Sequence, residues 1–186
     1  MILDMKTIVF CNVITNIICL VFIALLWQQS RKRFSGTGFF VFNFALQTTA
    51  LFLIISRGSI SDWMSIVLAN TMIIAGALLG YMGLLRFLEK KSSQVHNYIL
   101  LAVFAFIHTY VTFVQPDLAA RNLNLSVGLL IICGQCSWLM LYRTEPDKRP
   151  LTRGVGLSFI IYCVVSVIRI IDYFTVAQTG NDFFQS

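Results

Sequence analysis

Charged side chains are scarce in this sequence. They make up 12% of its residues, whereas roughly 25% is usual for a soluble domain. Hydrophobic residues make up 58%, and the mean hydropathy is +0.80. This balance excludes an ordinary soluble domain and predicts an integral membrane protein. The net charge of +6 does not indicate nucleic-acid binding, because the basic residues lie in short loops between apolar runs.

The sequence also lacks the motifs of the common catalytic sites. It contains no Ser-His-Asp arrangement, no pair of catalytic carboxylates, no glycine-rich phosphate loop and no His-Glu zinc motif. Its two histidines lie in different surroundings: His96 is in a loop and His108 is in an apolar run. A metal or haem site would need a second ligand beside His108. We therefore expect no enzyme activity, no metal and no cofactor.

Cysteines are few and none lies in a polar loop. The five are Cys11, Cys19, Cys133, Cys136 and Cys163, all within apolar runs, so a secreted disulfide framework is not indicated. Cys133 and Cys136 have the CxxC spacing of redox sites. Apolar burial disfavours the thiolate that redox chemistry needs. We interpret these two as packing residues, and a redox pair is the alternative.

Six long apolar runs account for most of the chain. About 20 apolar residues are needed for a helix to cross a bilayer, and the connections are too short to hold a soluble domain. Proline is confined to these connections, at positions 116, 146 and 150. The pattern predicts an all-α fold, a polytopic membrane helix bundle with six transmembrane helices in a single transmembrane domain over residues 1–186. The expected spans are residues 8–27, 39–55, 64–85, 98–114, 125–142 and 155–174.

The third span carries a face of small residues and is expected to be the central helix. Gly76 and Gly80 form a GxxxG pair, which places both glycines on one side of a helix, and Gly83 lies near the same side. Such a face lets another helix approach closely. We predict that these three glycines are helix-packing residues. The alternative is that they reflect only the higher glycine content of membrane helices.

The basic residues predict the orientation. Ten of them lie in the first, third and fifth connections, against three, Lys6, Arg57 and Arg121, on the other side. Short loops rich in Lys and Arg face the cytoplasm. We therefore expect the N-terminus outside and, after six spans, the C-terminal end of this segment outside as well.

With this orientation, several polar residues fall in the outer half of the membrane. Asn70, His108 and Arg169 are expected there, with Asp172 and Arg121 closer to the outer boundary. Polar groups in lipid are costly and usually face the interior of a bundle. One interpretation is a shallow polar ligand-binding pocket lined by these five residues. The other is a set of interhelical hydrogen bonds, with Arg169 paired to Asp172 one turn away.

Four segments carry a resemblance to a known family. They are Leu25-Leu26-Trp27 with Arg31-Lys32-Arg33-Phe34; Asp62-Trp63-Met64-Ser65-Ile66-Val67-Leu68-Ala69-Asn70; Gly83-Leu84-Leu85-Arg86-Phe87-Leu88; and Gln115-Pro116-Asp117-Leu118-Ala119-Ala120-Arg121, followed by Ser126. On these residues the chain resembles the N-terminal multi-helix membrane sensor region of bacterial signalling proteins, notably GGDEF-type diguanylate cyclases and some histidine kinases. The resemblance implies a seventh helix and a cytoplasmic output domain. Neither a GGDEF signature nor a phosphoacceptor region occurs in these residues, so only the sensing or anchoring role carries over.

The sequence thus predicts a sensory or regulatory input module of a bacterial signal-transduction protein, incomplete without a further helix and an output domain. It would sense a small or lipophilic ligand through the polar pocket. A small transporter or permease-like protein is the alternative from another class, and a purely structural anchor is the third. The expected location is the bacterial inner membrane. The expected partners are the lipid bilayer, a second copy in a homodimer and a cytoplasmic signalling domain or protein, but no nucleic acid.

Overall fold

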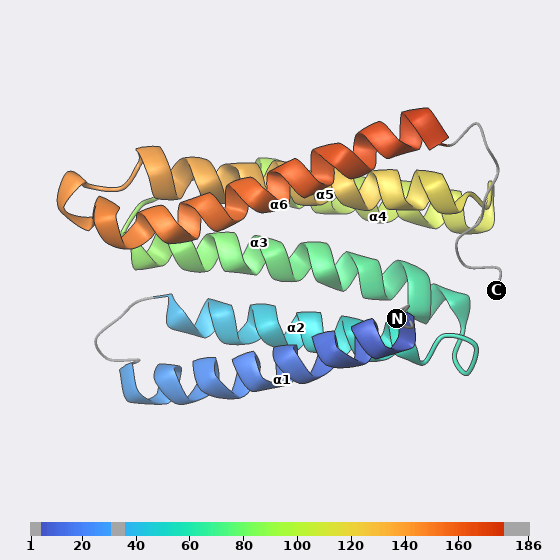
Figure 1. Ribbon diagram of the computed structural model, residues 1–186, viewed down its shortest axis with the longest axis horizontal. Coiled ribbons are helices and arrows are strands. Elements are labelled where there is room, and N and C mark those ends of the chain that lie inside the picture. Colours follow the sequence, from blue (N-terminus) through green and yellow to red (C-terminus); the bar gives the residue numbers. More distant parts are fainter. Residues whose placement is uncertain (1–4, 31–35, 177–186) are drawn as a thin grey trace. The chain divides into compact units, whose positions relative to one another are not determined.

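Helices make up nearly all of the structure. The computed structural model describes residues 5–30 and 36–176, and these contain six long helices and no β-strand. In chain order they are α1 (Met5–Ser30), α2 (Thr37–Ile55), α3 (Ala69–Phe87), α4 (Val95–Phe113), α5 (Leu118–Tyr142) and α6 (Arg149–Val176) (Figure 1). A π-helical turn, Trp63–Leu68, leads into α3, and a 3-10 turn, Pro146–Lys148, leads into α6. All six helices of the described part are long and apolar enough to cross a membrane. The predicted all-α fold with six membrane-spanning helices is confirmed.

The largest error in the predicted boundaries is at the start of α5. The sequence predicted a start at residue 125, but the helix begins at Leu118. Asp117 caps it: its Oδ1 accepts hydrogen bonds from the backbone N–H groups of Ala119 (2.8 Å) and Ala120 (3.1 Å). An aspartate at this position satisfies helix donors that would otherwise have no partner. The cap places Arg121 and Asn124 inside the helix rather than in a loop before it.

The start of α6 was also predicted too late, at residue 155 instead of Arg149. The 3-10 turn winds the chain into the helix, because the N–H groups of Lys148 and Arg149 both donate to the carbonyl oxygen of Glu145, at 3.0 and 3.1 Å. Pro150 is tolerated because a proline in the first turn of a helix removes a donor that has no partner there. Helix α1 likewise extends beyond its predicted span of residues 8–27 at both ends.

The chain divides into two compact units, unit 1 (Met1–Asn97) and unit 2 (Tyr98–Ser186). In unit 1, α2 contacts both α1 and α3. The share of the membrane-spanning stretch that is buried is 44% for α3 and for α5, and between 6% and 17% for the other four described helices. The single domain predicted over residues 1–186 stays a prediction.

The contact between α2 and α3 in unit 1 is made over the glycine face. A Cβ atom on Gly76 would lie 3.1 Å from Oδ1 of Asn43, and one on Gly80 would lie 3.2 Å from Nδ2 of the same residue. The neighbouring Gln47 donates from Nε2 to the carbonyl oxygen of Ile73, at 3.2 Å. The glycines therefore leave room for a polar side chain of α2, which lies directly against the α3 backbone.

The start of α2 is held against the end of α3 by a second close approach. Gly36, which precedes α2, has φ of 95°, and a Cβ there would lie only 2.7 Å from the carbonyl oxygen of Gly83. Both the backbone conformation and the space require glycine. Beside it, the Arg86 guanidinium lies over the ring of Phe39, 5.0 Å from its centroid, a distance typical of a cation–π contact.

In unit 2, α5 and α6 form a hairpin. A Cβ on Gly156 would lie 2.7 Å from Cδ2 of Leu141, so the Leu141 side chain of α5 packs directly against the backbone of α6 there. The buried Thr152 of α6 donates from Oγ1 to the carbonyl oxygen of Met140 in α5, at 3.0 Å. These contacts fix the end of the hairpin where the two helices are joined.

Candidate functional site

A buried histidine on α4 is the centre of the strongest candidate site, which lies within unit 2. His108 is 1% exposed, and its ring is stacked on that of Phe104, with centroids 5.1 Å apart and an angle of 19° between the planes. The two residues are four positions apart and so lie on the same face of the helix. An ionisable side chain buried in a membrane-spanning segment is rare and usually functional.

Helix α5 supplies the polar partner of this histidine. Asn124 donates from Nδ2 to the carbonyl oxygen of Phe104 at 3.1 Å, and the same nitrogen lies 3.5 Å from Nδ1 of His108. Arg121 lies three residues before Asn124, and so on the same face of α5. We call these four residues, Phe104, His108, Arg121 and Asn124, the His108 cluster.

His108 on α4 and Ser126 on α5 each have a buried polar atom with no hydrogen-bond partner among the described residues. These atoms are Nε2 of His108 and Oγ of Ser126, a residue that is 1% exposed. A buried polar atom left unpaired costs about 1–3 kcal/mol. The neutral imidazole can donate or accept at this nitrogen, depending on its tautomer. The imidazole of His108 is therefore a group to which a small polar or amphipathic molecule could hydrogen-bond.

The predicted pocket residues are only partly brought together. Arg121 and His108 belong to the same cluster. Arg169 and Asp172 are exposed on α6, so they lie outside its buried part. Asn70 is half-buried in unit 1 and donates to the carbonyl oxygen of Ile66 in the π-helical turn before α3, at 2.8 Å. Because Asn70 and His108 belong to different units, a pocket shared by Asn70, His108 and Arg169 stays a prediction.

Asn124 and Ser126 were not among the predicted site residues. The predicted fifth span began at residue 125, one position after Asn124. The signal that could have corrected this is local: Pro116 followed by Asp117 is a typical helix start, with Asp117 as the N-cap. Starting the helix at Leu118 would have placed Arg121 and Asn124 three residues apart on one face.

The CxxC residues of α5 are free thiols. Cys133 and Cys136 are buried, 7% and 2% exposed, and Cys163 of α6 is half-buried with Sγ 4.0 Å from the carbonyl oxygen of Leu130. Residues 5–30 and 36–176 contain no group of three or more His, Cys, Asp and Glu side chains that could hold a metal ion. The geometry around these thiols is that of packed interior side chains.

Comparisons with known proteins find no relative. No protein-family model matches the chain, and neither a curated protein nor a solved structure does.

Proposed function

We propose that this protein is a membrane-embedded sensory or regulatory input module of a bacterial signal-transduction protein. The observation that supports it is the buried His108 cluster, where an imidazole nitrogen has no protein partner within the described residues. A hydrogen bond formed to such a desolvated group is stronger than one formed in water, which suits a ligand-binding site. The ligand class that fits is a small or lipophilic molecule with a hydrogen-bonding group.

The geometry of the cluster offers a way to transmit binding. Asn124 of α5 is bonded to a backbone atom of α4, and it also lies beside Nδ1 of His108. A ligand bonded to Nε2 would favour one tautomer and one ring position of His108. That choice decides whether Nδ1 can accept from Asn124, and so it changes the contact between α4 and α5. A ligand shifts such an equilibrium only by its difference in affinity for the two arrangements.

The resemblance to sensor regions of GGDEF-type cyclases and histidine kinases supports the same proposal. In this arrangement the chain lies in the bacterial inner membrane with its basic connections in the cytoplasm, and an output domain or partner protein reads the helices from there. Cyclase or kinase activity belongs to that output and not to the helices described above.

A chimera tests the proposal. The chain, extended by one transmembrane helix, is joined to a GGDEF-type cyclase domain of known activity, and cyclic di-GMP is measured in cells at equal amounts of membrane protein. We expect His108→Phe and Asn124→Leu each to change the output by several-fold. The matched control is Phe106→Leu, on the same helix but 74% exposed, which should leave the output unchanged.

The result that overturns the proposal is an output unaffected by either cluster variant. The transporter alternative has its own measurement, solute flux across proteoliposomes containing the purified chain. Flux that is lost in His108→Phe, together with an unchanged cyclase output, would support a transporter or permease instead of a sensor.

A further inference from the structure

The connection between α5 and α6 is built around buried threonines. Thr144 donates from Oγ1 to the carbonyl oxygen of Leu139 (3.1 Å), and Thr152 donates to that of Met140 (3.0 Å); both are less than 10% exposed. Arg149 donates from Nε to the carbonyl oxygen of Thr144 (3.3 Å). This last bond orients the guanidinium of Arg149 toward the end of α5.

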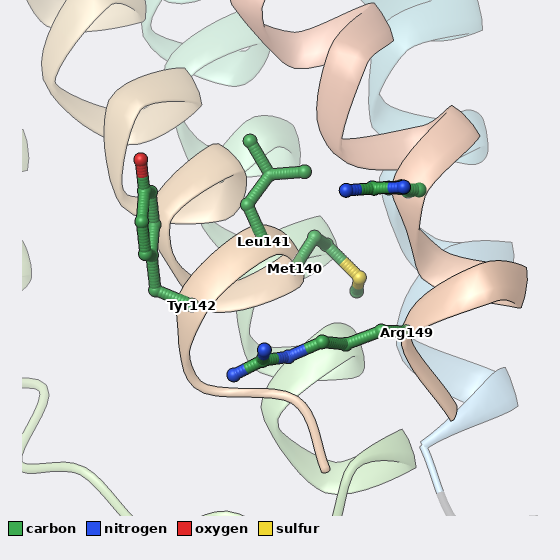
Figure 2. Close-up of a pocket in the computed structure, with 5 residues that line it drawn as sticks. Met140, Leu141, Tyr142 and Arg149 are labelled. Carbon is green, nitrogen blue, oxygen red and sulfur yellow. The ribbon is translucent and has the colours of Figure 1, made fainter. Parts of the chain in front are cut away.

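A pocket of about 340 Å³ lies at this end of the hairpin. Three of its lining residues come from the last turn of α5 and two from the first turns of α6. They are Met140, Leu141, Tyr142, Arg149 and Arg153. Figure 2 shows the side chain of Arg149 extending from α6 toward the end of α5, below Met140 in this view. The pocket therefore has an apolar wall on α5 and two guanidinium groups on α6.

The charge of the surrounding turn is positive. Residues 143–153 contain four basic and two acidic side chains, and one acidic group is already paired, since Nζ of Lys148 lies 3.2 Å from Oε2 of Glu145. Arg149 and Arg153 are exposed at the pocket. Two arginines converging on one pocket match a phosphate group, because each guanidinium can bind it through two parallel hydrogen bonds.

The pocket also lies at the ends of two stretches that are long and apolar enough to cross a membrane. The membrane-spanning stretch of α5 ends at Tyr142 and that of α6 begins at Thr152, so Arg153 is one residue inside the apolar stretch. Trp138 and Tyr142 are stacked with ring centroids 4.6 Å apart, and both are more than half exposed. Exposed Trp and Tyr side chains at helix ends are typical of the boundary between lipid and water.

We infer that this pocket binds the head group of an anionic phospholipid. Arg149 and Arg153 hold its phosphodiester, and the polar glycerol end of the head group occupies the remaining volume. The acyl chains lie along the exposed aromatic pair on α5. Basic pockets between transmembrane helices are known to take anionic head groups. The apolar wall of Met140, Leu141 and Tyr142 favours a lipid over a free phosphate ion, which would gain nothing from it.

Lipid retention by the full chain tests the inference. The protein is purified in neutral detergent and mixed with phosphatidylglycerol or phosphatidylcholine, and bound lipid is counted by native mass spectrometry. We expect one phosphatidylglycerol molecule to bind in preference to phosphatidylcholine. Each basic side chain near a membrane surface contributes about 1 kcal/mol, so Arg149→Gln/Arg153→Gln should weaken this binding roughly thirtyfold.

The matched control is Arg57→Gln/Lys91→Gln, which removes the same charge from exposed positions in unit 1. It should retain the lipid. A second variant, Arg149→Lys/Arg153→Lys, keeps the charge but loses the bidentate geometry; it should bind with intermediate affinity, and it carries the test if the glutamine variant does not fold. Equal loss in the control, no preference for phosphatidylglycerol, or displacement of the lipid by inorganic phosphate at equal concentration would each overturn the inference.

Discussion

Asn124 of α5 donates a hydrogen bond to the backbone carbonyl of Phe104 in α4, at 3.1 Å. The bond joins two helices through an atom that no substitution of Phe104 can remove, and it brings the amide beside the buried ring of His108. Hydrogen bonds between membrane helices contribute about 0.6 kcal/mol on average and up to about 1.7 kcal/mol. This contact therefore connects the stability of unit 2 to the candidate site.

The first prediction concerns this bond. Asn124→Leu should destabilise the chain by about 1 kcal/mol, because it removes the donor and leaves Nδ1 of His108 facing an apolar side chain. Unfolding in mixed detergent, followed by circular dichroism, measures the change. Asn122→Leu is the control on the same helix, since Asn122 is exposed. Equal losses in the two variants would contradict the prediction.

The second prediction concerns the glycine face of α3. Gly80→Leu should lower the melting temperature clearly, because a Cβ there already lies 3.2 Å from Nδ2 of Asn43 and overpacking costs about 1–3 kcal/mol. Gly134→Leu in α5 provides the control, as its Cβ position has no contact within 4 Å apart from the neighbouring residues and backbone of its own helix. A Gly80→Leu protein that melts at the temperature of the unmodified chain would disprove the packing role.

The third prediction separates backbone strain from steric exclusion. Gly36 and Gly58 both have positive φ, 95° and 92°, but only Gly36 has close neighbours, whereas Gly58 has none within 4 Å. Gly58→Ala should cost about 1–2 kcal/mol from conformation alone. Gly36→Ala should cost more, because its Cβ would lie 2.7 Å from the carbonyl oxygen of Gly83. Thermal unfolding of the two variants measures the difference, and equal costs would show that this close approach can relax.

The fourth prediction concerns the buried thiols. Cys133 and Cys136 should remain reduced and react slowly with a membrane-impermeant maleimide in intact membranes, because both are less than 10% exposed. The positive control is Ser59→Cys, which places a thiol at an exposed loop position. Mass spectrometry of the labelled chain gives the extent of reaction. Labelling of Cys133 or Cys136 as fast as that of the control would revive the redox interpretation.

The fifth prediction concerns orientation. If the basic connections face the cytoplasm, residue 186 lies outside after six spans. Alkaline phosphatase joined after Ser186 should then be active, while green fluorescent protein at the same point should be dark. Fusions after Glu89 should give the reverse, since that residue lies in a basic connection. A bright fluorescent fusion at residue 186 would mean that the number or the direction of the spans is wrong.

Much of the fold could be predicted because its main cause is local. A run of about 20 apolar residues becomes a membrane helix whatever its neighbours are, so the six helices follow from composition alone. The boundaries that were missed depend on single capping and turn residues. Asp117 starts α5 one turn after α4 ends, and Glu145 winds the chain into α6. Both signals are single polar residues, and a prediction based on the length of apolar runs does not detect them.

The candidate site was only partly predictable. The free-energy cost of placing His108 and Arg121 in a membrane helix can be inferred from the sequence, because it depends on residue type and depth. Their partners are not visible, because they depend on which faces of α4 and α5 meet. Asn124 reaches Phe104 only because of the rotation of one helix about its axis relative to the other.

The sequence by itself determined that this is an all-α protein with six membrane-spanning helices, since hydrophobic length is a property of each segment alone. The tertiary structure decided what each polar residue does. The GxxxG spacing indicates a close approach on α3, but only packing selects Asn43 of α2 as the side chain that fills the space. In the same way, Arg149 and Arg153, one turn apart on α6, line a single pocket only because α5 places Met140, Leu141 and Tyr142 beside them. The preference of each apolar segment for the membrane depends on that segment alone, whereas such contacts depend on the fit between two helix surfaces.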